Sequence, residues 1–138
     1  MMRHATLAPG DPVPDSCVPR LEEAGQLVAA AVYGQSIPVN ERERYLCLAW
    51  ARAEPPGRAA GARLVVRYNQ QNGDWYEHHE KEPLVALQQG LAGWQPLVLV
   101  VTVPEGAARL VVLLHAENQE EGATALFDDA GVYRLPYP

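Results

Sequence analysis

The residues between positions 68 and 76 form the densest group of side chains that could contact a ligand. Two kinds of group occur together there, aromatic rings and side-chain amides. The residues are Tyr68, Asn69, Gln70, Trp75 and Tyr76. Aromatic rings can stack on the faces of sugar rings while amides hydrogen-bond to hydroxyls, so the group predicts a glycan-binding surface. The alternatives are that the same aromatics pack across strands or anchor a protein interface.

The remaining reactive side chains form no catalytic pattern. No Ser, Cys or Thr stands in a nucleophile-elbow context, and the sequence has no glycine-rich phosphate loop. Asp128 and Asp129 are adjacent, so on a regular strand they would point to opposite faces instead of forming an acid/base pair. The run Glu77-His78-His79-Glu80 matches no common zinc spacing and is interpreted as an exposed polar hairpin. We therefore predict that the protein is not an enzyme.

The stretch from Trp94 to Leu135 indicates which elements carry these residues. It holds three apolar runs, which are Leu97–Val103, Ala108–Ala116 and Ala123–Phe127. Pro104-Glu105-Gly106 and a polar segment ending in Gly122 separate them, and both separators have turn chemistry. The runs are Val- and Leu-rich and short, which predicts consecutive antiparallel strands. Their apolar residues fall on both faces, as expected for strands covered by a second sheet.

Earlier parts of the chain show the same strand pattern. Strands are predicted over Gln26–Tyr33, Tyr45–Ala53, Ala62–Tyr68 and Leu84–Leu87. Asn72-Gly73 is a hairpin signal, which predicts Trp75–His79 as the returning strand. About eight strands with irregular connections fit an all-β fold, a two-sheet antiparallel jelly-roll β-sandwich, better than an up-and-down barrel.

Several short motifs appear in a familiar order. They are Gly93-Trp94, Val103-Pro104-Glu105-Gly106, the strand from Ala108 to Leu114, and Phe127-Asp128-Asp129, preceded by Ile37-Pro38-Val39 and Tyr45–Arg52. This order resembles the jelly rolls of carbohydrate-binding modules in the galactose-binding-like class, over residues 25–135. The resemblance implies that Trp50 and Trp94 are packing residues.

The resemblance also implies a structural calcium ion at Asp128 and Asp129. Calcium takes about six to eight oxygen ligands, so further groups such as Glu22 and Glu23 would be needed. The chain departs from the acidic N-terminal strand usual in those modules. The alternative is that one aspartate caps the final turn. No other cofactor is expected.

Composition limits the classes of partner. The 138 residues carry a formal net charge of -6 without a basic cluster, which argues against nucleic acid. No apolar run is long enough for a secretion signal or a membrane span. Cys17 and Cys47 could pair or stay free, so the sequence leaves the redox compartment open.

The chain is divided into an extended arm, residues 1–20, and one jelly-roll domain, residues 21–138. The arm is defined by Pro9, Pro12, Pro14 and Pro19, which favour extended backbone, and the alternative is a disordered leader. An arm on a non-catalytic sandwich suits a structural subunit of an assembly, with protein neighbours and homo-oligomers as partners. We expect a virion component, such as a capsid decoration or tail accessory protein of a phage. The alternative is a glycan-binding module.

Overall fold

The computed structural model describes residues 25–30, 34, 36–55, 61–77, 82–88, 93–116 and 121–136. The described strands are β1 (Gln26–Ala30), β2 (Ser36–Pro38), β3 (Arg44–Glu54), β4 (Ala62–Asn69), β5 (Leu84–Ala86), β6 (Gln95–Thr102), β7 (Arg109–Ala116) and β8 (Thr124–Arg134). The predicted arm, residues 1–20, lies outside the described residues. In the described ranges no helix is long and apolar enough to cross a membrane.

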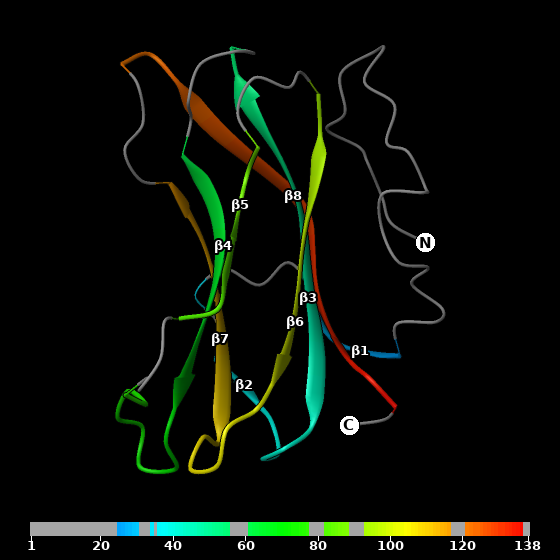
Figure 1. Ribbon diagram of the computed structural model, residues 1–138, viewed down its shortest axis with the longest axis vertical. Helices are drawn as coiled ribbons and strands as arrows, with labels where there is room; N and C mark the ends of the chain where they lie inside the picture. The colour runs from blue at the N-terminus through cyan, green and yellow to red at the C-terminus, as the bar shows by residue number, and fades with distance from the viewer. Residues whose placement is uncertain are drawn as a thin grey trace.

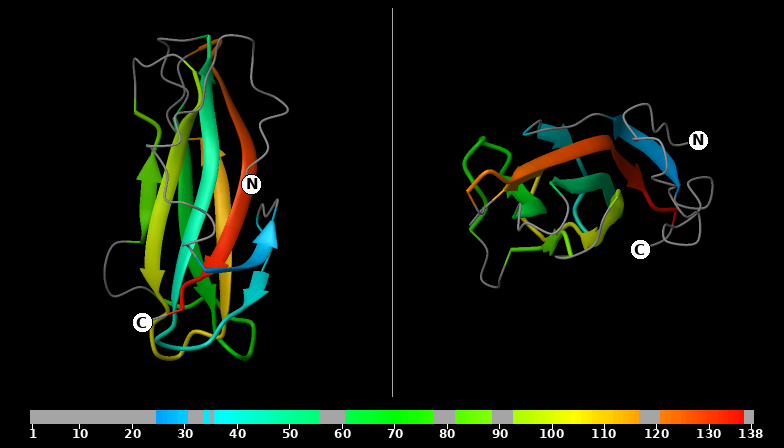
Figure 2. Two further views of the ribbon diagram at one scale, coloured as in Figure 1. Left: turned by 90° about the vertical axis from the view of Figure 1, so that its right-hand side faces the viewer. Right: turned by 90° about the horizontal axis from the view of Figure 1, so that it is seen from above.

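The strands form two antiparallel sheets that pack face to face (Figures 1 and 2). Sheet A has the order β1-β8-β3-β6, and sheet B has the order β2-β7-β4-β5. The first strand therefore pairs with the last, the second with the seventh, the third with the sixth and the fourth with the fifth. This is the pairing of a long antiparallel ribbon rolled into two sheets, so the predicted jelly-roll β-sandwich is confirmed.

The core between the sheets follows from the period of two along each strand. In β3, Tyr45, Cys47, Ala49 and Ala51 belong to the buried cluster between the layers. The inward residues of β4 come from the same alternation, and they are Ala62, Leu64, Val66 and Tyr68. Side chains that alternate across a strand place one set in this core and the other set on the outer face of the sheet.

The last third of the chain differs from its prediction in one respect. The three apolar runs are strands, but consecutive strands do not lie side by side, because β6 and β8 belong to sheet A and β7 to sheet B. The rolled ribbon explains this result, since β6, β7 and β8 each pair with strands from earlier in the chain and not with one another. The Pro104–Gly106 turn is present, with Ala107 N–H donating to the Pro104 carbonyl at 3.2 Å.

The predicted strand Trp75–His79 is wrong for its described part. Gly73 has a φ of 92°, as the turn requires, but Trp75 forms only an isolated bridge with Asn69. The other strands predicted before Trp94 are confirmed where the structure describes them, as β1, β3, β4 and β5. The chain just after Asn69 therefore pairs with β4 only at Trp75 and forms a surface loop instead of a strand.

Cys47 lies in the centre of β3 and is fully buried as a free thiol. Burial raises the pKa of this thiol to about 12, because the thiolate would lose its hydration. The Cys17 position lies outside the described residues.

Candidate functional site

The predicted ligand-binding group starts where β4 ends. The chain turns over residues 70–74, where Gly73 N–H donates to the Gln70 carbonyl at 2.9 Å and Gln70 N–H to the Asp74 carbonyl at 2.8 Å. Polar side chains hold the same turn: Asn72 Nδ2 donates to Asp74 Oδ2 at 3.1 Å, and Gln70 Nε2 to the Trp75 carbonyl at 3.2 Å. The loop shape is therefore fixed by hydrogen bonds within the loop itself.

Tyr68 is not on the surface. Its side chain is 2% exposed and belongs to the core between the sheets. The expectation that its ring is an exposed platform is wrong, because Tyr68 lies on the inward side of β4 by the two-residue alternation. The ring instead meets the Tyr76 ring edge-on, with centroids 6.2 Å apart and an interplanar angle of 81°. This contact links the core to the loop.

Asn69 connects three strands. Its carbonyl accepts from Ala108 N–H at 2.8 Å, and its Oδ1 atom accepts from the Ser36 hydroxyl at 3.3 Å. Ser36 in turn accepts from Arg109 Nε at 2.7 Å. These bonds tie the end of β4 to β2 and β7, and Asn69 does not line the pocket described below.

Trp75 is the most exposed large apolar side chain of the described residues, at 54%. The Arg67 guanidinium lies over its ring, 5.8 Å from the centroid. Glu82 holds that guanidinium with two oxygens, at 2.5 Å from Nε and 3.4 Å from Nη2. The carboxylate thus positions the arginine and the arginine favours one orientation of the indole, although all three side chains are partly exposed and each contact is weak.

A pocket lies at this end of the sandwich. Figure 1 shows the loop after β4 and the β6–β7 turn at the same end of the two sheets. The pocket has a volume of about 380 Å³ and is lined by Gln70, Asp74, Trp75, Tyr76, Glu77 and Gly106. Asp74, Trp75, Glu77 and Gly106 are exposed, so the pocket is an open hollow on the surface. Three of the five predicted residues are brought together here, while Tyr68 and Asn69 support them from behind.

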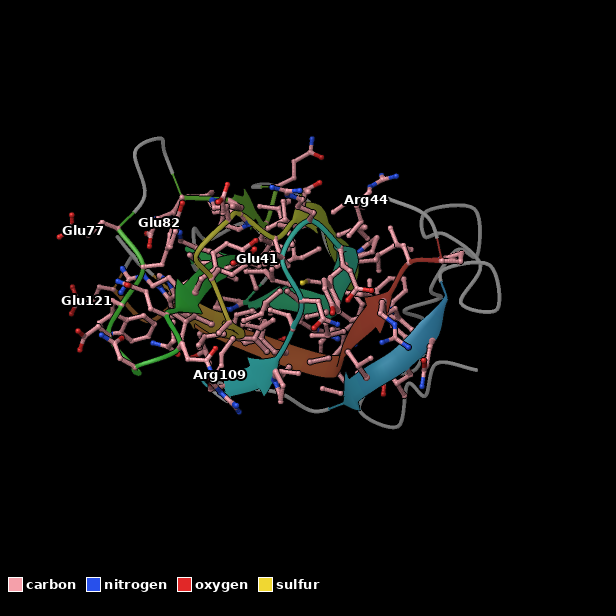
Figure 3. All side chains as sticks on the ribbon, turned by 90° about the horizontal axis from the view of Figure 1, so that it is seen from below. Glu41, Arg44, Glu77, Glu82, Arg109 and Glu121 are labelled. Atoms are coloured by element: carbon pink, nitrogen blue, oxygen red, sulfur yellow. The ribbon has the colours of Figure 1, made fainter. Side chains whose placement is uncertain are left out.

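Sequence reasoning missed Asp74, Glu77 and Gly106 as pocket residues. Gly106 could not be predicted from the sequence, because only the fold brings the β6–β7 turn next to Tyr76. The two residues are close: a Cβ atom added to Gly106 would lie 3.7 Å from the Tyr76 ring. Asp74 and Glu77 directly flank Trp75 and Tyr76 in the sequence. This adjacency could have predicted that they belong to the same site. In Figure 3 the Glu77 side chain points outward on the sheet B side.

The predicted calcium residues lie within β8, not at a final turn. Leu48 pairs with Gly131 and Trp50 with Asp128, so β8 has one more residue than β3 between these pairs. Asp129 occupies this β-bulge with a φ of 49°. The strict alternation expected for the two aspartates is therefore broken, and the alternative role as a turn cap is wrong.

The structure neither confirms nor contradicts the calcium prediction. In the described ranges no group of three or more His, Cys, Asp and Glu side chains could hold a metal ion. Glu22 and Glu23 lie outside those ranges, so the calcium site stays a prediction.

The outer face of sheet A is a second surface that could contact a partner. Leu46 and Leu48 are buried there and pack against three partly buried residues, Val98, Tyr133 and Leu135. Three of the four exposed large apolar residues of the described chain have register positions on this face; they are Leu27, Val100 and Leu126. The outward positions from Leu46 to Trp50 and from Pro96 to Val100 carry no charged side chain.

Trp50 and Trp94 are 1% and 6% exposed, which confirms them as packing residues. Trp50 is one of the β3 residues whose side chains face away from sheet B. Trp94 contacts Arg52, whose guanidinium lies 5.8 Å from the Trp94 ring centroid. Apolar residues of both parities in Tyr45–Ala53 were the sequence signal for this face. Sheet B covers only one side of β3, so the other set of apolar residues lies on the outer face of sheet A.

Comparison with known proteins adds no relative. No protein-family model matches the chain, and a search of curated proteins found no match. The fold defines the class as an all-β jelly-roll sandwich. Its function is inferred from two surfaces, the pocket beside Trp75 and the outer face of sheet A.

Proposed function

We propose that the protein is a non-catalytic structural module that joins an assembly through the outer face of sheet A, with a second copy of the chain as the neighbour. The observation that supports this proposal is the apolar centre of that face, with Leu27, Val100 and Leu126 exposed at 49%, 44% and 38%. A contiguous apolar patch on a surface is typical of a protein interface. Figure 2 shows in its left view how the four strands present this face as one surface.

The ends of β3 supply the argument for a second copy as the occupant, because the net charge of -6 by itself opposes self-association. Along β3, Arg44 lies at one end of the outward series and Glu54 at the other. In a two-fold contact with the β3 strands antiparallel, Arg44 of each copy approaches the Arg52–Glu54 ion pair of its neighbour, in which the Nη2 and Oε2 atoms are 3.0 Å apart, and would share the Glu54 carboxylate with Arg52.

The assembly is tested by sedimentation equilibrium of the full chain. Val100→Glu and Leu126→Glu each place a charge in the apolar face, while Ala86→Glu changes an exposed residue of β5 in sheet B and is the matched control. We expect each face variant to weaken self-association by about 10- to 100-fold, the cost of about 1.4 to 3 kcal/mol at an interface. A monomeric wild type, or equal effects of all three substitutions, would falsify this proposal.

The arm and the virion setting are finer parts of the proposal, and they are supported by the sequence alone. The arm, with Pro9, Pro12, Pro14 and Pro19, would extend the contact to the neighbour, since proline loses little entropy on docking. Deletion of residues 1–20 should then weaken association of the folded chain, measured in the same centrifuge runs. Unchanged association would remove the arm from the proposal. Absence of the chain from purified virus particles of its host would remove the virion setting.

A glycan-binding module is the second candidate function, and the pocket beside Trp75 favours it. An orientated indole, a second aromatic ring and the Gln70 amide provide the groups that bind sugars. Trp75→Ala should abolish retention on a glycan array, whereas the Ala86→Glu variant should be retained like wild type. Equal retention of Trp75→Ala and wild type would place sugar binding elsewhere or remove it.

A further inference from the structure

We infer that the pocket at the loop after β4 accepts an organic cation, of the ammonium or guanidinium class. This inference goes beyond both proposed functions, because it requires neither an assembly nor a sugar. It depends on three properties of the lining, which are its charge, its aromatic rings and the way in which the indole is held.

The charge of the lining is negative. Asp74 and Glu77 supply two carboxylates, and none of the six described lining residues is basic. The nearest arginine with a contact to the lining, Arg67, is ion-paired with Glu82, with its Nε atom 2.5 Å from the carboxylate. The described lining therefore brings a cationic ligand near the Asp74 and Glu77 residues, and the Arg67 charge beside Trp75 is offset by Glu82, whereas an anionic ligand would be repelled.

The aromatic rings favour the same class of ligand. Trp75 and Tyr76 both line the pocket, and the π-face of an aromatic ring attracts cations. The chain itself demonstrates this property, because the Arg67 guanidinium already lies 5.8 Å from the Trp75 ring centroid. Trp75 nevertheless remains 54% exposed, so much of the indole is still available to a ligand.

The pocket is also held in place before binding. Trp75 is fixed by the Arg67–Glu82 pair, Asp74 by its contact with Asn72, and Tyr76 by the edge contact with the buried Tyr68 ring. Each support comes from outside the pocket, so the ligand does not have to order these side chains. A preorganised site loses less entropy on binding.

A neutral ligand would use this lining less completely. A sugar hydroxyl can donate to a carboxylate, but it gains nothing from the cation–π term, and a purely stacking ligand gains nothing from the two charges. A compact cation beside an aromatic ring and two carboxylates gains both. The structure therefore favours charge, and not hydroxyl groups, as the property that is recognised.

The test uses two probes of the same shape, choline and its uncharged isostere 3,3-dimethyl-1-butanol. Each is titrated into the full chain while the indole N–H signal of Trp75 is followed by NMR, assigned with Trp75→Phe. We expect choline to shift the signal and the isostere to leave it unchanged. Glu77→Gln should weaken choline binding by about two- to fivefold, as expected for one exposed charge pair.

Glu77→Gln is the main variant because Glu77 lies beyond the turn, whereas Asp74→Asn also changes a turn contact. Ala86→Glu is again the control outside the pocket and should bind choline like wild type. Equal shifts with both probes, no shift with choline, or full choline binding by Glu77→Gln would each overturn the inference. A neutral oligosaccharide that shifts the same signal in place of choline would support the glycan candidate and reject the cation.

Discussion

The two outer faces of the sandwich differ although both sheets have four antiparallel strands. On sheet B, the outward positions interleave valines with arginines: Val65 and Val111 are buried beside Arg63, Arg67 and Arg109. On sheet A, the centre of the outer face holds Leu46, Leu48, Val98 and Tyr133 without a charged residue among them. Charged groups on this face lie toward the ends of β3, at Arg44, Arg52 and Glu54, and at Asp128 of β8, which pairs with Trp50.

The two outer faces differ in how they meet solvent. Long cationic side chains can cover apolar surface with their stems and keep their charges in water, so the outer face of sheet B is suited to contact with solvent. The outer face of sheet A uses apolar side chains, ranging in size from Val98 to Trp50, and leaves Val100 and Leu126 exposed. Such a surface gains free energy when a partner covers it. Substitutions on the two faces should therefore differ in their effect on stability.

The largest effect is expected at Leu48, which is 1% exposed although it lies on the outer series of β3. Leu48→Ala should lower the free energy of unfolding by about 2 to 5 kcal/mol, the range for buried leucine truncations. Leu113→Ala, at a partly exposed outward position of sheet B, should cost less. Urea unfolding measures both variants. Equal losses would show that the two outer faces contribute alike and would break the comparison.

An intermediate effect is expected on the inner side of the same strand, at Cys47. Its pKa rises from 9.0 in the unfolded chain to about 12 in the fold, so the folded state holds the proton more tightly between these values. Stability is therefore fully present below pH 9 and falls as the pH rises toward 12, by at most about 1.4 kcal/mol per pH unit from this group.

The measurement for Cys47 is urea unfolding at a series of alkaline pH values, with Cys47→Ala as the comparison. The alanine variant should lose less stability with rising pH than wild type, because it has no thiol to ionise. Identical slopes for the two proteins would mean that the thiol does not contribute. Buried tyrosines such as Tyr68, whose pKa burial also raises, give the background common to both.

The smallest effect is expected at Arg67 on the outer face of sheet B. Its side chain is 46% exposed and pairs with Glu82, so Arg67→Ala should change the free energy of unfolding by less than about 1 kcal/mol. A double-mutant cycle with Glu82→Gln at low and high salt measures the pair. A loss comparable to that of Leu48→Ala would mean that sheet B also depends on its outer face for stability.

The sequence was sufficient for the class of fold but not for the partners of each strand. Alternating apolar residues, with glycine and proline between the runs, identified β3, β4, β6 and β7. The pairing of β1 with β8 and of β2 with β7 could not be predicted, because the sequence pattern suggests that consecutive strands pair. The bulge at Asp129 was also missed, since a local pattern does not reveal one extra residue against a distant strand.

The candidate site was predictable in composition and not in geometry. Gln70, Trp75 and Tyr76 were named from their residue types, and the fold brings them to one pocket. Tyr68 has the same chemistry but lies in the core, because its parity in β4 decided its side of the sheet. Gly106 entered the site from a turn some thirty residues away in sequence, which only the packing of the two loops could show.

What the sequence determined by itself was the alternation of each strand and the positions of the turns, because these depend on local backbone geometry and on the period of two. Only the tertiary structure decided which of two apolar faces became the core, which stayed outside, and which loops met. Those outcomes depend on pairings between residues far apart in the chain. The local sequence of a strand does not specify which distant strand will pair with it.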